Sequence, residues 1–292
     1  MSDASTSLIR GVADTARWVA FYRALETERP DAVFRDPFAR RLAGERGQQI
    51  SEAMKDATRA QWAFVARTYL FDHFIEQEVR SGVTLVVNLA AGLDTRPYRM
   101  ALPATLRWVE VDQPELLEEK AAILAGSRPV CALERIALDL AAEGPRRELF
   151  RRIAESAERV LIVTEGLLAY LEEPQVGRLA EDLAAHESFR SWVLDLTTPK
   201  LLRIIQKSWG RRLSDAGARL QFAPESGPAF FAGHGWQVDE VRATLTTAAQ
   251  LKRLPFLLSL LARLPAAGKF HPQRPWSGVC LLRRRPGDVA AG

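Results

Sequence analysis

Residues 88–96 read NLAAGLDTR and follow the apolar run Leu85-Val86-Val87. A strand that reads as buried therefore leads directly into a turn that holds a glycine, an acid and an arginine, namely Gly92, Asp94 and Arg96. In an open parallel sheet, ligands bind beyond the carboxyl ends of the strands, and a glycine there lets them approach the backbone. The helix that follows offers free amide groups. Taken alone, the glycine fits a plain tight turn equally well.

The next predicted strand ends in carboxylates. It lies in RWVEVDQPE, residues 107–115, where Asp112 follows Gly92 by 20 residues. An acid at this place can accept the hydroxyl protons of an adenosine ribose. The alternative is a surface carboxylate that caps the helix beginning at Pro114.

The composition of the turn favours one adenosine-containing cofactor over another. A dinucleotide site needs GxGxxG so that a pyrophosphate can lie against bare backbone, whereas Ala90, Ala91 and Leu93 occupy this turn. S-adenosylmethionine carries an adenosine and no phosphate, so a turn with fewer glycines suffices. We therefore expect S-adenosylmethionine. A nicotinamide-dependent oxidoreductase and an inert binding subunit stay as alternatives.

The order of apolar runs predicts an α/β fold with a parallel sheet that is covered on both faces. Short apolar strands alternate with amphipathic helices from residue 84 onward. We expect strands at 84–90, 107–112, 135–139, 159–165, 191–197, 236–241 and 279–282, the last two as an antiparallel pair at one edge. We expect helices near 114–125, 146–157, 174–187, 224–233 and 246–262.

Residues 1–80 read as helices, interrupted at Asp36-Pro37, and we expect them to form a helical lid. Residues 81–292 would form the main domain, with an insertion at 199–221 that shapes an acceptor pocket. No internal repeat or low-complexity linker divides the chain, so one domain with insertions is preferred.

Composition excludes several classes of protein. The chain has 292 residues with 47% hydrophobic and 26% charged side chains, which is ordinary globular usage. The 40 Lys and Arg against 36 Asp and Glu give only +4, which does not indicate nucleic-acid binding. Cys131 and Cys280 lack metal-site spacing. No signal-peptide core and no membrane-length apolar run is present, so we expect a cytoplasmic protein without a membrane partner.

Four motifs, in this order and spacing, resemble the leucine carboxyl methyltransferase family. They are NLAAGLDTRPYR at 88–99, WVEVDQPELLEEK at 108–120, ALDL at 137–140 and VTEGLLAYL at 163–171, and the resemblance runs from about 13 to 285. LDTRPYR and the final WSGVCLLRR strand look closer to bacterial tetracenomycin-type O-methyltransferases of polyketide carboxyls than to the enzyme that esterifies a protein phosphatase. The resemblance implies a Rossmann-like class I methyltransferase fold: a mostly parallel seven-stranded sheet, an antiparallel last strand and a helical N-terminal lid.

The resemblance also implies a set of cofactor contacts at the strand ends. Gly92, beside Ala90, would line the methionine part of S-adenosylmethionine, and Asp112 would hold its ribose. Asp139 and Leu140 would flank the adenine.

At the methionine end, the resemblance assigns Glu165 to the cofactor amino group. Arg67, in VARTYLFD, matches the arginine that pairs with the cofactor carboxylate, and Arg59 competes for that role.

Several of these residues have a second interpretation. Asp139 can cap the following helix, and Glu165 can pair with a neighbouring arginine. Arg96 either binds the methionine carboxylate or braces Asp94 across the turn. Tyr170 either points its hydroxyl at the methyl acceptor or belongs to the core.

The absence of a convincing nucleophile and base pair bears on the methyl acceptor. Methyl transfer mainly needs alignment, and a carboxylate is already ionised, so it requires no strong base. We therefore expect a carboxylate on a small, polyketide-like natural product or a peptide. A phenol or alcohol would need a base, for which His234 and His271 are the candidates. The apolar stretch 254–264 reads as a packed helix, or else as a pocket wall or partner contact.

Overall fold

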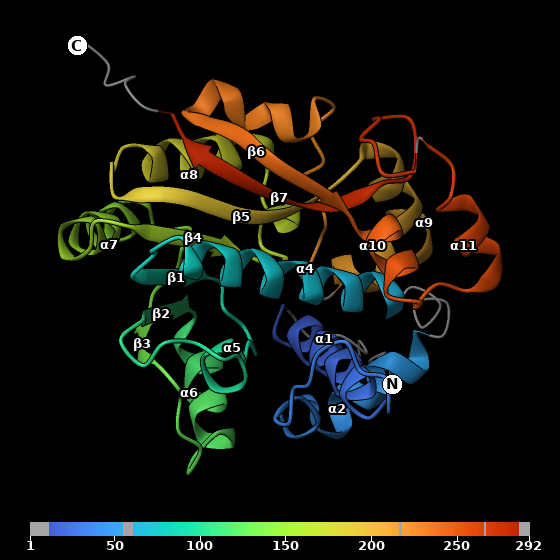
Figure 1. Ribbon diagram of the computed structural model, residues 1–292, viewed down its shortest axis with the longest axis horizontal. Coiled ribbons are helices and arrows are strands. Elements are labelled where there is room, and N and C mark those ends of the chain that lie inside the picture. Colours follow the sequence, from blue (N-terminus) through green and yellow to red (C-terminus); the bar gives the residue numbers. More distant parts are fainter. Residues whose placement is uncertain (1–11, 55–60, 216–217, 266, 286–292) are drawn as a thin grey trace, which may run out of the picture.

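The protein is described by a computed structural model, which covers residues 12–54, 61–215, 218–265 and 267–285. Its centre is a seven-stranded sheet with the order β3-β2-β1-β4-β5-β7-β6 (Figure 1). The strands are β1 (Leu85–Leu89), β2 (Arg107–Asp112), β3 (Ala132–Ala137), β4 (Val160–Thr164), β5 (Phe189–Thr197), β6 (Trp236–Ala243) and β7 (Ser277–Arg284). β1 to β5 pair in parallel, and β7 runs antiparallel to both β5 and β6. The expected mostly parallel sheet with an antiparallel last strand is confirmed.

The two central strands are apolar on both faces, as a sheet covered on both sides requires. Every residue of β1 and β4 is buried. Successive side chains alternate between two apolar clusters, so Val87 and Ile162 lie in one cluster while Val86 and Leu161 lie in the other.

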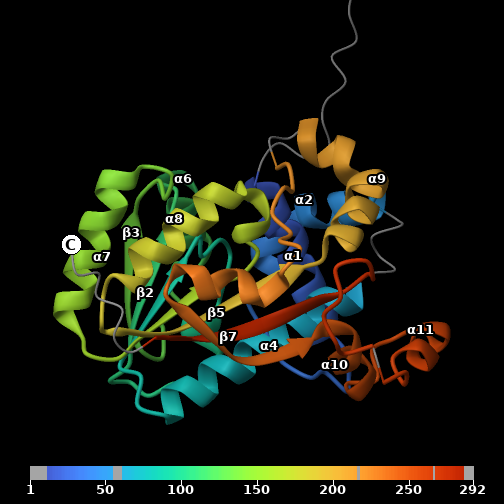
Figure 2. The same cartoon turned by 90° about the horizontal axis from the view of Figure 1, so that it is seen from above.

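Helices cover both faces of this sheet, as Figures 1 and 2 show. Apolar side chains of α7, α8 and the 3-10 helix η2 belong to the cluster on one face, and those of α4 to the cluster on the other. The helices within and after the sheet region are α5 (Arg96–Arg99), α6 (Pro114–Ile123), α7 (Glu143–Ser156), η1 (Leu168–Tyr170), α8 (Glu173–Ala184), α9 (Pro199–Asp215), η2 (Gly227–His234), α10 (Thr244–Gln250) and α11 (Phe256–Leu261).

The N-terminal helices form a third apolar cluster above the strand ends. α1 (Val12–Thr27) and α2 (Ala39–Ala53) pack on each other, and Trp18 and Tyr22 contact Phe64 of α4 (Gln61–Arg80). Further along α4, Phe74 lies in the cluster against the sheet. Helix α4 therefore joins α1 and α2 to the sheet.

Some elements differ from the sequence prediction for identifiable reasons. β3 begins at Ala132, whereas the predicted strand began at 135. It is an edge strand with polar residues between its apolar ones, so a search for an apolar run does not find its first residues. Residues 227–234 form a 3-10 helix, and the expected 246–262 helix is divided before Pro255, which cannot donate a helical hydrogen bond. Within the described residues, no helix is long and apolar enough to cross a membrane.

Trp192 should be essential to the stability of the sheet. It is fully buried, its indole N–H donates to Thr164 at 2.9 Å, and its ring lies 5.2 Å from that of Phe231. We expect Trp192→Ala to lower the free energy of unfolding by about 3–5 kcal/mol in urea denaturation. Val130→Ala, at an exposed side chain, should change it by less than about 0.5 kcal/mol. Equal losses in the two variants would contradict this.

Candidate active site

A cavity of about 470 Å³ lies at the carboxyl ends of the central parallel strands. Four strands contribute to it directly or through the turns that follow them. These contributions are acidic or amide side chains, namely Asn88 of β1, Asp94 after β1, Asp112 of β2, Glu165 after β4 and Asp195 of β5. The sheet thus places carboxylates around one hollow, where the strand-end rule expects a ligand.

The turn after β1 is fixed to the end of β2 by its own backbone. The Gly92 amide donates to Oδ2 of Asp112 at 2.6 Å, and Gly92 has a φ of +51°, which favours glycine. A Cβ at Gly92 would lie 3.6 Å from the Cβ of Ala16, so α1 passes directly over the turn. Burial raises the pKa of Asp112 above its usual range, although the Gly92 amide opposes this. Asp112 and Gly92 both line the cavity, together with Ala90.

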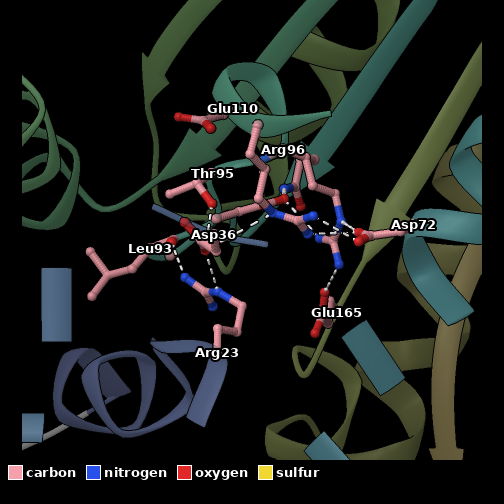
Figure 3. A network of polar contacts seen from close by, with 12 residues as sticks. Arg23, Asp36, Asp72, Leu93, Thr95, Arg96, Glu110 and Glu165 are labelled. Atoms are coloured by element: carbon pink, nitrogen blue, oxygen red, sulfur yellow. Dashed lines mark hydrogen bonds and ion pairs between the residues drawn. The ribbon is translucent and has the colours of Figure 1, made fainter. Parts of the chain in front are cut away.

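Arg96 binds three carboxylates from three parts of the chain, and two of them, Asp72 and Glu165, are labelled in Figure 3. Its Nε donates to Asp72 at 2.6 Å, Nη1 to Asp94 at 2.9 Å and Nη2 to Glu165 at 2.8 Å. The side chain is only 3% exposed. Of the two interpretations for Arg96, bracing the turn therefore describes what it does in this structure, and the brace extends beyond Asp94.

This ion-pair cluster sets the charge state of Asp94. Burial alone would raise its pKa, but Arg96, Lys120 and Arg99 together outweigh burial and lower the pKa to about 2. Oδ1 of Asp94 accepts from the Arg96 backbone amide at 2.9 Å, and the Asn88 side chain donates to Oδ2 at 2.7 Å. Asp94 stays ionised and holds the turn in one conformation.

Arg67 lies between the ends of β4 and β5. Its Nε donates to Glu165 at 3.1 Å and its Nη1 to Asp195 at 3.3 Å, while its guanidinium lies over the Phe64 ring. Glu165 thus pairs with two arginines, Arg67 and Arg96, and these lower its pKa despite burial. The competing Arg59 lies outside the described residues.

Asp195 was missed by the sequence analysis. Its Oδ1 accepts from the Gly166 amide at 2.7 Å, and burial raises its pKa. The signal that could have found it is the rule that found Asp112, because Asp195 also lies near the carboxyl end of a parallel strand.

Asp139 and Leu140 are not among the described residues that line the cavity. Asp139 lies beyond β3 and accepts the Ala141 amide at 2.9 Å, while the Leu140 carbonyl accepts from Arg146 at 2.8 Å. Asp139 therefore stabilises the turn before α7, and the adenine contacts of both residues stay predictions.

Tyr170 lines the cavity from η1. Its hydroxyl donates to Thr15 of α1 at 3.4 Å, and burial raises its pKa, so the phenol stays neutral. The structure leaves it facing the cavity, and contact with an acceptor stays a prediction.

A second polar contact ties the N-terminal helices to the same turn. Asp36 is 1% exposed and accepts from Arg23 at 2.8 Å and from Thr95 at 2.7 Å. Arg23 also donates to the Leu93 carbonyl at 2.6 Å (Figure 3). Sequence analysis treated Asp36 only as part of a helix break, because nothing local in the sequence pairs it with the turn.

The rest of the cavity wall is largely apolar. It comes from α1, α4, α9 and the segment after α9, whose side chains the structure describes up to Ser208 and again from Ala218. The large apolar members are Trp18, Val19, Trp62, Phe64, Leu201, Leu202, Ile204, Ile205, Leu220 and Phe222. Described residues between 199 and 221 therefore line the cavity, and the role of this segment as an insertion that shapes an acceptor pocket stays a prediction.

Neither histidine proposed as a base is found among the described residues of the cavity wall. His234 lies in η2 with its Nδ1 2.9 Å from Glu181, and His271 accepts the Gln273 amide at 3.2 Å. Among the described residues, no cluster of three or more acids, histidines or cysteines could hold a metal ion.

Removing the Arg96 guanidinium should unfold the site. We expect Arg96→Met to lower the free energy of unfolding at neutral pH by about 3–5 kcal/mol, because three carboxylates would lose their shared cation. The pKa of Asp94 is about 2 in the folded protein and about 3.9 when unfolded. Its stabilising contribution is therefore present above about pH 4 and is lost as the pH falls toward 2.

In Arg96→Met the carboxylates take up protons more readily. The difference in free energy of unfolding between the parent protein and this variant should therefore become smaller between about pH 5 and pH 3. Chemical denaturation across this range checks the prediction. Arg151→Met removes an exposed arginine paired with Glu148 and Glu155, and its free energy of unfolding should differ little from that of the parent protein. A deficit that is small at neutral pH, or that widens with acid, would contradict the assignment.

Comparison with known proteins agrees with this geometry. A relative from Streptomyces coelicolor, named as an S-adenosyl-L-methionine-dependent methyltransferase, is 35% identical over 239 residues, which are 78% of this chain and 83% of that protein. A second relative, from Streptomyces avermitilis, is also named as an S-adenosyl-L-methionine-dependent methyltransferase. It is 34% identical over 242 residues, which are 78% of this chain and 84% of that protein. These names agree with the cofactor expected from the sequence.

Solved structures share the fold. A DUF574 family protein from Streptomyces avermitilis matches with a TM-score of 0.60 at 12% identity, covering 93% of this chain and 97% of that chain. A structure from Thermobifida fusca, named as a methyltransferase, matches with a TM-score of 0.60 at 14% identity, covering 96% and 97%. These matches confirm the Rossmann-like methyltransferase fold.

The family itself follows from the sequence match. The model of the leucine carboxyl methyltransferase family matches residues 16–184, which include the turn after β1, Asp112, Glu165 and Tyr170. This match also sets aside the nicotinamide-dependent alternative. The chain belongs to the leucine carboxyl methyltransferase family.

Proposed function

We propose that the protein is an S-adenosylmethionine-dependent O-methyltransferase that esterifies a carboxylate on a small, largely apolar molecule, in the manner of the tetracenomycin-type enzymes. The observation that carries this proposal is the division of one cavity into a carboxylate-rich floor and an apolar wall, with no histidine among its described lining residues. A carboxylate at the end of a peptide is the other acceptor that fits.

The floor of the cavity suits a cationic cofactor without a diphosphate. Four carboxylates line it, those of Asp94, Asp112, Glu165 and Asp195, against the three guanidinium groups of Arg23, Arg67 and Arg96. This excess of negative charge favours a cation and disfavours a diphosphate. S-adenosylmethionine, when bound, supplies a methyl group activated by its sulfonium.

Asp112 and Gly92 are the residues best placed to hold the adenosine end. The Gly92 amide already donates to Asp112, so this amide does not remain available to a phosphate. Asp112 is partly exposed and lines the cavity, and its second oxygen accepts the Gln113 amide at 2.8 Å. An ionised carboxylate can accept more hydrogen bonds than these, so it can bind hydroxyl groups of a ribose.

The side chains on the acceptor side of the cavity favour a carboxylate as the methyl acceptor, because a carboxylate needs no general base. Glu165 and Asp195 are both paired with arginine, and burial keeps Tyr170 neutral. None of these groups is free to deprotonate an alcohol. A carboxylate is ionised at neutral pH, so the protein needs only to align it and to exclude water, as the helices over the strand ends can do.

The volume of the cavity limits the size of the acceptor. Ligand pockets commonly measure about 300–1,000 Å³, and this cavity of about 470 Å³ must hold both the donor and the acceptor. A compact molecule with an apolar or aromatic body fits beside Trp62, Phe64 and Phe222. Of a peptide, only the terminal residue would enter.

Asp112 should be required for binding of the donor. In calorimetry with S-adenosylhomocysteine, we expect Asp112→Asn to weaken binding about 10- to 100-fold, because the amide keeps an acceptor for Gly92 but loses the charge. Glu115→Gln, at an exposed acid three residues away that does not line the cavity, should bind as the parent does. Tight binding of NAD instead, or equal affinities in the two variants, would contradict the assignment.

The position of the transferred methyl group tests the acceptor class. Incubation with a labelled donor and a set of aromatic and aliphatic acids should give a labelled product that mild base hydrolyses to methanol. A product stable to mild base would show methylation of a hydroxyl group. An absence of label transfer, with donor binding intact, would favour an inert binding subunit.

A further inference from the structure

A surface near the C-terminus exposes apolar side chains that the rest of the described chain leaves uncovered. Of the seven large hydrophobic side chains exposed in the described residues, five lie between Phe256 and Leu264. Phe256 and Leu257 are 76% and 74% exposed, and the other members of this apolar patch are Leu260, Leu261 and Leu264. Monomeric soluble proteins rarely gather exposed apolar groups in one place, so the patch indicates a binding surface.

Most of the patch lies on the short helix α11. Four of its members lie at positions i, i+1, i+4 and i+5 of α11, which places them on one side of the helix at about 100° per residue. No residue of α11 is buried. Figures 1 and 2 both show α11 at the outer edge of the molecule, beyond α10.

The base of this protrusion is held firmly. Arg253, just before α11, donates to Glu26 at 2.8 Å and pairs with Asp31 at 3.1 Å, both from the region around the end of α1. The Arg253 side chain is 6% exposed. The patch therefore projects from a fixed stem.

The segment of the chain that carries the patch is basic and contains no acids. No Asp or Glu occurs between Val241 and Arg285. Four basic residues of this segment are exposed, namely Lys252, Arg263, Lys269 and Arg274. The two acids that contact the stem, Glu26 and Asp31, are paired with Arg253. This composition therefore favours a binding partner that is both apolar and anionic.

We propose that the apolar patch inserts into the headgroup and acyl boundary of an anionic lipid bilayer, with the four exposed cations on the lipid headgroups. A projecting apolar tip with basic neighbours combines the two forces that hold peripheral proteins to membranes. A second copy of this chain is a poorer occupant, since a two-fold interface would place the same cations opposite one another. Peripheral contact needs no spanning helix, and this proposal departs from the expectation of no membrane partner. It is independent of the proposed function.

Sedimentation of the full-length protein with vesicles tests the proposal. Vesicles of phosphatidylcholine alone would be compared with equal mixtures of phosphatidylcholine and phosphatidylglycerol, at about 0.05 M and about 0.5 M NaCl. We expect binding to the anionic vesicles at low salt and weak binding to the neutral ones. Phe256→Ser combined with Leu260→Ser should reduce the bound fraction about tenfold or more. Because both side chains are exposed, the variant should fold normally.

Two further variants sharpen the result. Arg263→Glu with Lys269→Glu should weaken binding to anionic vesicles while leaving the small affinity for neutral ones unchanged. Val130→Ser, at an exposed apolar residue outside the patch, should bind as the parent does. Failure to bind anionic vesicles would overturn the proposal, and so would binding that the patch substitutions leave intact. A molecular mass in light scattering that doubles, and that the patch substitutions halve, would instead identify an interface between copies.

Discussion

The buried guanidinium of Arg96 is the constraint on which the site depends. It connects Asp72 of α4, Asp94 of the turn after β1 and Glu165 of the turn after β4, and so adds a direct contact to the strand pairing and helix packing that already hold these segments. Burying these charges costs free energy, and that cost is offset only while all three carboxylates stay in place. The cluster therefore fixes the relative positions of the two turns that form the cavity floor.

The helices over the strand ends are held to the same turn by a second buried acid. Asp36 joins Arg23 of α1 to Thr95, and Arg23 also reaches the Leu93 carbonyl. The apolar wall of the cavity comes largely from α1, α4 and α9. This contact therefore fixes the position of α1 relative to the turn that forms part of the cavity floor. Such an arrangement provides the alignment and exclusion of water that methyl transfer to an ionised acceptor needs.

Sequence reasoning succeeded where the relevant pattern was local. The apolar strands and the strand-end residues Gly92 and Asp112 could be predicted, because strand ends in a parallel sheet meet at one edge. Glu165 was implied by the resemblance to the family. Asp36 and Asp72 could not, since they lie in helical regions and their partners are far away in the sequence. The edge strand β3 was misplaced because its polar residues break the apolar pattern. The stretch 254–264 reads as core, since apolar content does not reveal whether anything covers it.

A crystal structure of the protein with S-adenosylhomocysteine tests the central claim most directly. We predict that the ligand lies in the cavity at the ends of β1, β2 and β4, with its ribose hydroxyl groups within hydrogen-bond distance of Asp112 and Arg96 still held by its three carboxylates. A ligand bound elsewhere, or a cavity from which Asp112 points away, would contradict the account.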